Sequence, residues 1–266
     1  MSRLLRSNFS RLKKGKLMWI YLYTMLFIGL FTILNANSDV AIENIIFVVI
    51  IINGFLSAVF TSLFIGTEYS DGTLRNKLII GHRRTTIYLA NLITVLVITT
   101  ITAIAYLVPV IAIGLPKLGG ITISAEGFLI LVSLSIITMI LFDALYTFLS
   151  MLISGKAMAS VTCLLTAIVL LFINALMFSA LTEPKEYILH DAEDITGEEV
   201  IPNPSYVTGV KREIYQFITD VSPMGQALQI ELRKVEKPAR VGTFGVVLTT
   251  ILTVSGMVAF KKKDIK

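Results

Sequence analysis

Six apolar segments, each about 20 residues long or longer, set the main constraint on how this chain can fold. A helix needs about 20 apolar residues to cross a bilayer, and backbone groups in lipid must be paired within their own segment. The sequence therefore predicts an all-α membrane protein with six transmembrane helices. The six segments are Leu17–Leu34, Ile45–Ile65, Thr85–Gly114, Phe128–Ser150, Met158–Leu181 and Val241–Phe260.

Composition supports a membrane protein. Of the 266 residues, 55% are hydrophobic and 15% are charged, whereas soluble domains carry about 25% charged residues. The single cysteine, Cys163, lies in an apolar segment and forms no metal or disulfide spacing pattern. The net charge of +5 raises the question of a nucleic-acid partner.

The positions of the basic residues answer that question. Lysine and arginine concentrate in cytoplasmic flanks of membrane helices, and here they flank the segments on the side of both termini, while the short loops of the other side hold only Lys117. We therefore expect both termini to be cytoplasmic in a plasma membrane, and no nucleic-acid partner. The flanking residues are Arg3, Arg6, Arg11, Lys13, Lys14, Lys16, Arg75, Lys77, Arg83, Arg84, Lys156, Lys261, Lys262, Lys263 and Lys266.

Two polar stretches bear on the fold outside the bundle of apolar segments. Leu5, Phe9 and Leu12 share one helical face within a basic N-terminal stretch, which favours an interfacial helix over a disordered basic flank. Residues 183–240 form a polar, partly acidic insertion within a single domain spanning 1–266. We expect one or two short helices resting on the outer face there, in a segment large enough to cover the exit of a transport path.

The connection between the second and third segments has the pattern of a short amphipathic helix. Ser70 or Asp71 can cap its start, and Gly72 permits a tight turn. Leu74 and Leu78 then share a face at i and i+4. Such a helix at the cytoplasmic side is suited to docking a soluble partner, although an ordinary basic loop fits the same residues.

A glutamate, an acidic-Gly-Thr-Leu turn, a short helix and an arginine pair resemble the signature of ABC-2 type transporter permeases. The six-helix topology, basic lead and large external segment are also similar to that family. The resemblance implies that Glu68 and the Gly72–Thr73 turn contact a separate ATPase subunit. It also implies pairing with a second permease, identical or similar. The ATPase-coupling residues by this resemblance are Glu68, Asp71, Gly72, Thr73, Leu74, Arg75 and Leu78.

Two positions depart from the family pattern. Gly81-His82 stands where many members have proline, and Asn91 stands where many have lysine. The phosphate-binding pattern G-x-x-x-x-G-K-[ST] is absent, and the nearest run, Ser154–Ala157, lacks its first glycine and its hydroxyl. We therefore expect no enzyme activity and no cofactor in this chain, with ATP and Mg²⁺ bound by the partner ATPase.

Polar residues within the apolar segments are candidates for a substrate path. Asp143 lies about 12 Å from the cytoplasmic end of its segment, where a carboxylate is costly unless it faces protein or water. The resemblance implies that Asn53 and Asn174 lie in helices that line a central cleft, and both amides can also hydrogen-bond between helices. For all three residues, a structural role remains open beside the functional one.

Small residues recur every four positions in the second segment. This pattern lets two helices approach closely, either between two copies or within one chain, and the sequence does not decide between them. The residues are Gly54, Ala58, Ser62 and Gly66.

Other functions are less well supported. The run His190–Asp194 could hold a divalent cation weakly, but we expect no specific metal site. An intramembrane enzyme would need a catalytic constellation that the helices do not offer. A secondary transporter would depend on Asp143, and a sensor or immunity protein could use the same fold. For an exporter, the apolar segments suit an amphipathic peptide, antibiotic or lipid-like cargo.

Overall fold

The computed structural model describes residues 1–190 and 198–264 and confirms the all-α class. Ten helices and one two-stranded hairpin occur in this part of the chain. In chain order they are α1 (Ser2–Lys14), α2 (Lys16–Leu34), α3 (Ile42–Ser70), α4 (Thr73–Ile79), α5 (Arg84–Leu118), α6 (Ala125–Leu152), α7 (Lys156–Thr182), β1 (Glu186–His190), β2 (Glu198–Pro202), α8 (Gly209–Val221), α9 (Pro223–Glu231) and α10 (Pro238–Lys262).

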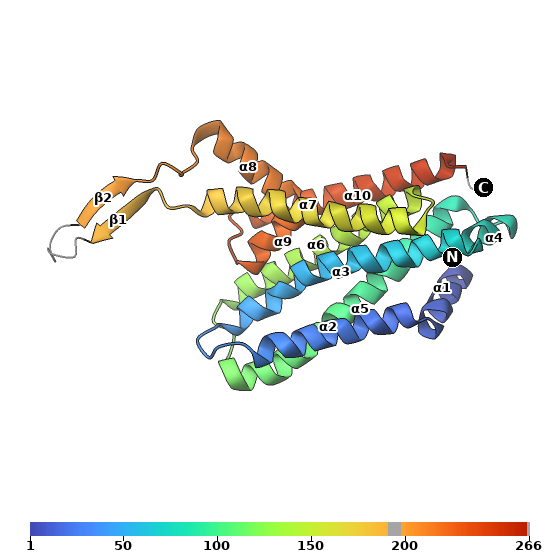
Figure 1. The fold of residues 1–266 in the computed structure, drawn as a ribbon, viewed down its shortest axis with the longest axis horizontal. Coiled ribbons are helices and arrows are strands. Elements are labelled where there is room, and N and C mark those ends of the chain that lie inside the picture. The colour runs from blue at the N-terminus through green and yellow to red at the C-terminus, as the bar shows by residue number, and fades with distance from the viewer. Residues whose placement is uncertain (191–197, 265–266) are drawn as a thin grey trace.

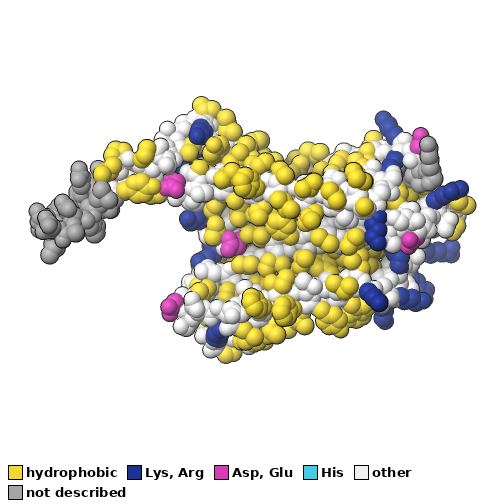
Figure 2. Space-filling view, viewed as in Figure 1, with side chains coloured by type: hydrophobic (Ala, Val, Ile, Leu, Met, Phe, Trp, Pro, Cys, Tyr) yellow, Lys and Arg dark blue, Asp and Glu magenta, His cyan; other side chains and the backbone are white. Residues whose placement is uncertain are grey.

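Six of these helices, α2, α3, α5, α6, α7 and α10, are long and apolar enough to cross a membrane. Each contains one predicted segment and extends it by one or more residues. Apolar side chains cover the middle of the bundle, and charged side chains gather at its two ends (Figure 2). The chain is therefore a multi-pass membrane protein.

Both termini lie at the same end of the bundle (Figure 1), and lysine and arginine gather there (Figure 2). We call this end, which holds α1, α4 and the last turn of α10, the basic end. The opposite end, from which β1 and β2 project, is called the hairpin end. An even number of spanning helices accounts for the common location of the two termini.

Helix α3 is the centre of the bundle. In its most apolar stretch 67% of the residues are buried, compared with 17% in the corresponding stretch of α10. A Cβ atom on Gly54 would lie 2.9 Å from the ring of Phe142 in α6, and one on Gly66 would lie 2.8 Å from the Cα atom of Lys156 in α7. Ala58 and Ser62 are fully buried. The small-residue face is therefore used for packing within the chain.

The expectation that the helices after α7 rest on the outer face is wrong for α9. This helix packs between α3, α6 and α7. A Cβ atom on Gly225 would lie 2.3 Å from the carbonyl oxygen of Thr219, so glycine is needed for this approach. Gln226 is fully buried and accepts a hydrogen bond of 3.1 Å from Thr138 of α6. Small and amide side chains thus allow α9 to enter the bundle.

The acidic first half of the insertion contains an antiparallel hairpin, with Glu186 opposite Pro202 and His190 opposite Glu198. The sequence analysis did not predict these strands. The hairpin extends away from the helices (Figure 1). It therefore does not lie over the end of the bundle, where a cover for the exit of a transport path was expected. Most of the candidate cation site at His190–Asp194 lies outside the described residues.

Candidate functional site at the basic end

The last turn of α3 carries Glu68 beyond the end of the predicted apolar segment. Its side chain is fully buried. Gly72 follows with a left-handed φ of 64° and caps α4, and Thr73 Oγ1 donates a hydrogen bond of 3.2 Å to the carbonyl oxygen of Glu68. No side chain caps α4, so the expected capping by Ser70 or Asp71 is wrong. The glycine turn instead folds α4 back against α3.

Two cations from different helices meet the Glu68 carboxylate. Arg11 of α1 places Nη2 3.0 Å from Oε1, and its guanidinium lies 4.3 Å from the ring centre of Phe64. Lys77 of α4 donates a short hydrogen bond to the same oxygen. Burial lowers the pKa of Lys77, while the Glu68 charge opposes that shift. The carboxylate thus holds α1 and α4 against α3.

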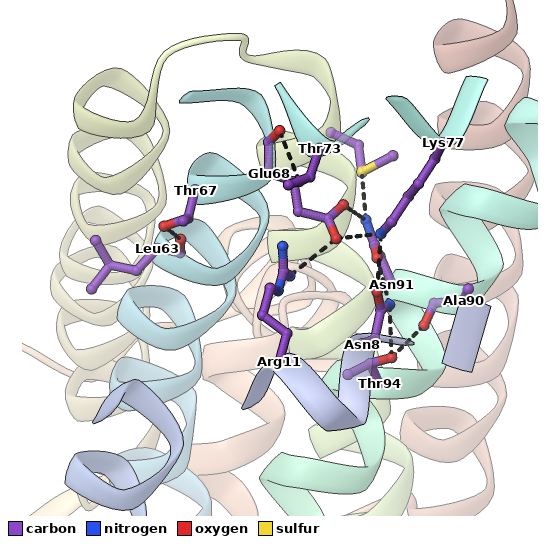
Figure 3. Close-up of polar contacts among 11 residues, drawn as sticks. Asn8, Arg11, Leu63, Thr67, Glu68, Thr73, Lys77, Ala90, Asn91 and Thr94 are labelled. Atoms are coloured by element: carbon purple, nitrogen blue, oxygen red, sulfur yellow. Dashed lines mark hydrogen bonds and ion pairs between the residues drawn. The ribbon is translucent and has the colours of Figure 1, made fainter. Parts of the chain in front are cut away.

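Amide side chains complete the cluster (Figure 3). Asn91 of α5 donates to Glu68 Oε2 at 2.8 Å. Asn8 of α1 donates to Asn91 Oδ1 at 2.9 Å and to Thr94 Oγ1 at 3.1 Å. Lys77 Nζ donates to Asn8 Oδ1 at 2.9 Å. Every polar group of Asn8 and both carboxylate oxygens of Glu68 therefore have partners, and the cluster joins α1, α3, α4 and α5.

The energetic consequence follows from burial. A buried charge is tolerated when its partners are present, and removal of one partner typically costs about 3–5 kcal/mol because an uncompensated charge remains. The four elements are therefore coupled: a displacement of α4 that carries Lys77 away would expose or unpair Glu68. We call Asn8, Arg11, Glu68, Lys77 and Asn91 the Glu68 cluster.

The predicted coupling residues divide between an inner and an outer face of α4. Leu74 is fully buried, and Leu78 is partly buried against the core. Asp71 and Arg75 are exposed. The exposed face also includes Ile79 and Ile80, at 71% and 77% exposure. Because Glu68 is buried, its carboxylate does not belong to the exposed surface, and it contacts α4 through Lys77.

Sequence reasoning missed four members of this cluster as site residues. Asn8, Arg11 and Lys77 entered only as flank residues or not at all, and Asn91 entered as a departure from a family pattern. One signal was available, since Asn8 lies between Leu4 and Leu12 on a face where both neighbours are buried. A polar residue on an apolar helical stripe predicts a buried partner.

The basic end is also closed by the end of α10. Lys263 Nζ donates to the hydroxyl of Tyr69 at 2.9 Å and to the carbonyl oxygen of Met151 at 3.2 Å. Arg84 donates to the carbonyl oxygen of Phe260 at 3.1 Å. Burial lowers the pKa of Lys263 to about 8. These bonds connect α10 to α3, α5 and α6.

The three substrate-path candidates have different surroundings. Asn53 accepts a short hydrogen bond from Tyr21 of α2. Asn174 donates to Ser222 Oγ at 2.8 Å, just before α9. Both amides therefore hold helices together. Asp143 instead lines a cavity between α3, α5 and α6.

Comparisons add no family assignment. No model of a protein family matches the chain, and no curated protein matches its sequence. Within residues 1–190 and 198–264, no group of three or more His, Cys, Asp or Glu side chains is placed to hold a metal ion. The fold and the basic end thus define a multi-pass membrane protein with a buried ionic cluster beneath an exposed short helix.

Proposed function

We propose that the chain is the membrane-spanning permease subunit of an ATP-driven exporter resembling the ABC-2 type. A separate ATPase subunit would dock on the exposed face of α4. The observation that carries this proposal is the Glu68 cluster, because it links a short, surface-exposed helix to three other elements through buried charges. A loop without such links would be a poor element for transmitting force.

The proposed orientation places the basic end in the cytoplasm of a bacterial cell. Lysine and arginine favour the cytoplasmic side of membrane proteins, and they gather at the end that holds both termini. This orientation puts α4 on the side where ATP is present. The partner subunit would bind ATP and Mg²⁺ and would supply the ATP hydrolysis.

In the proposed mechanism, α4 can occupy two positions relative to the bundle, and the ATPase binds the helix with different affinity in each. A ligand shifts a conformational equilibrium only by its differential affinity for the two states. Movement of α4 carries Lys77, and Glu68 passes the displacement to α1 through Arg11 and to α5 through Asn91. Helices α1, α3 and α5 would then move together with α4 at the basic end and shift relative to the other helices of the bundle, which is the step that would open a path for cargo.

A second permease copy, identical or similar, belongs to the proposal. Gly54, Ala58, Ser62 and Gly66 are unavailable for that contact because they pack within the chain. Helices α2, α7 and α10 expose apolar faces along the bundle and are the surfaces on which a copy would pack. The proposed cargo is an amphipathic peptide, antibiotic or lipid-like molecule.

The test is purification of the tagged full chain from its native membranes, followed by an ATPase assay on what co-purifies. We expect a stoichiometric ATP-hydrolysing subunit that is lost when Ile79 and Ile80 are both changed to aspartate. Arg6→Ala, an exposed change at the same end, is the matched control and should retain the subunit. A pure preparation without a nucleotide-binding partner would contradict the proposal.

One observation supports a second candidate, a secondary transporter. Asp143 is a buried carboxylate that lines a cavity at membrane depth, and ionisable residues there commonly belong to ion pathways. Transport that continues when the partner's ATP site is inactivated would favour this candidate. Loss of transport under the same condition favours the exporter, while a sensor or immunity protein would transport nothing in either case.

A further inference from the structure

A cavity of about 430 Å³ lies between α3, α5 and α6. This volume falls within the range of about 300–1,000 Å³ that is typical of small-molecule sites. The cavity wall is mainly aliphatic, with the hydroxyl-bearing residues Thr99, Thr100 and Ser135 and the carboxylate of Asp143. Its lining includes Ile46, Leu96, Thr99, Ala103, Ser135 and Asp143.

The Asp143 carboxylate is incompletely paired. The residue is 1% exposed, and Oδ2 accepts a hydrogen bond of 2.5 Å from Thr99. Oδ1 is buried and has no hydrogen-bond partner. Among the residues that the structure describes, none of the ion pairs involves Asp143. Since a buried carboxylate without a counter-charge is costly, a donor group that reached this oxygen from the cavity would stabilise it.

The cavity faces the hydrocarbon region of the bilayer. Asp143 lies nine residues before the end of α6, or roughly 14 Å along the helix axis at 1.5 Å per residue. The cavity is also lined by Ile104 and Ile136, each 54% exposed on the lipid-facing surface. A ligand would therefore enter the cavity laterally from the membrane.

We propose that this cavity binds an amphipathic amine, with its hydrocarbon part against α5 and α6 and its amino group on Asp143. The aliphatic wall favours a hydrocarbon chain through removal of apolar area from water. The amine supplies N–H donors and, when protonated, the missing counter-charge for Oδ1. A lipid acyl chain would fill the volume but would leave that oxygen unpaired. The site does not depend on the proposed export function.

Photolabelling of the full chain in phosphatidylcholine nanodiscs tests this site. The probes are a dodecylamine and a dodecanol that carry the same diazirine on the chain. We expect the amine to label α5 and α6 around Leu96–Leu107 and Val132–Ile140 about tenfold more than the alcohol, equivalent to about 1.4 kcal/mol. Equal labelling by the two probes in the unaltered protein would overturn the proposal, since it indicates occupancy by any lipid chain.

Two variants separate the charge from the volume. Asp143→Asn keeps the side-chain size and an acceptor for Thr99, and should reduce amine labelling to the level of the alcohol. Ala103→Phe fills the cavity without changing the carboxylate and should reduce labelling by both probes. Val108→Phe, on the exposed side of α5, is the matched control and should change neither. Undiminished amine labelling of the Asn variant would also overturn the proposal.

Discussion

Helix α3 carries a buried glutamate at each end, and their surroundings differ. Glu68 at the basic end meets Arg11, Lys77 and Asn91, so that both of its oxygens are paired. Glu43 at the hairpin end meets Arg233 at 3.2 Å and accepts from Thr122, while its Oε2 has no partner. The two glutamates have the same chemistry but a different number of partners.

The difference indicates which end of α3 is held more firmly. Glu68 joins four helices and is compensated by two cations. Glu43 joins α3 to the turn before α6, through Thr122, and to the residues after α9, through Arg233. Both contacts at the hairpin end come from connecting segments. We infer that the basic end behaves as one rigid unit and that the hairpin end can adjust more easily.

The largest expected effect is that of Glu68→Ala. The substitution leaves Arg11 and Lys77 close together without their shared counter-charge, and loss of one partner from a buried ion pair costs about 3–5 kcal/mol. Thermal unfolding in detergent should show a corresponding loss of stability. Glu68→Asp, which keeps the charge on a shorter side chain, should retain more stability than alanine; equal losses would show that the charge does not hold this end.

Glu43→Ala should cost less, in the range of about 1–3 kcal/mol for a buried group left unpaired. The Arg233 side chain is 29% exposed, so water can replace part of its lost contact. The same unfolding assay, run beside the Glu68 series, provides the direct comparison. If the two alanine variants lose equal stability, the inferred difference between the two ends of α3 is wrong.

Asn8→Leu sharpens the comparison by removing the amide links while leaving the charges in place. Asn91 and Lys77 each lose a hydrogen bond to Asn8, and we expect a loss of about 1–3 kcal/mol. Because Asn8 is one of the contacts of α1 with α5, tryptic cleavage near Lys13 and Lys14 should become faster. Ser10→Ala, on the exposed side of α1, should stay within about 0.5 kcal/mol of the unaltered chain.

The sequence predicted the parts of this fold that the bilayer imposes. Segment length and backbone pairing identify six helices without any information about which helices contact one another. The short helix after Gly72 was also predictable, because its turn residue and its Leu74–Leu78 face are local features. The burial of Glu68 was not, since it depends on Asn8 and Asn91, which lie far from Glu68 in the sequence.

The same limit explains two further features of the fold. The sequence left open whether the small-residue face of α3 packs within one chain, because the same spacing of small residues also suits packing between two copies. The close approach of Gly54 to Phe142 of the same chain shows which arrangement occurs. Helix α9 belongs to the insertion, for which we expected short helices resting on the outer face. Its Gly225 and Gln226 fit between helices through contacts with Thr219 and Thr138, and no local pattern specifies those contacts.

The smallest expected effect concerns Lys263, another partly buried cation of the basic end beside Arg11 and Lys77. Burial lowers its pKa from 10.5 to about 8, so between these values the unfolded chain binds more protons at this site than the folded chain. Stability should therefore rise with pH from about 8 toward 10.5. Lys263→Met should flatten part of this rise in a thermal unfolding series, whereas Glu43→Ala should leave it in place. A rise that is unchanged in the methionine variant would assign the pH dependence to other lysines, and Lys263 would then not contribute to the difference between the two ends.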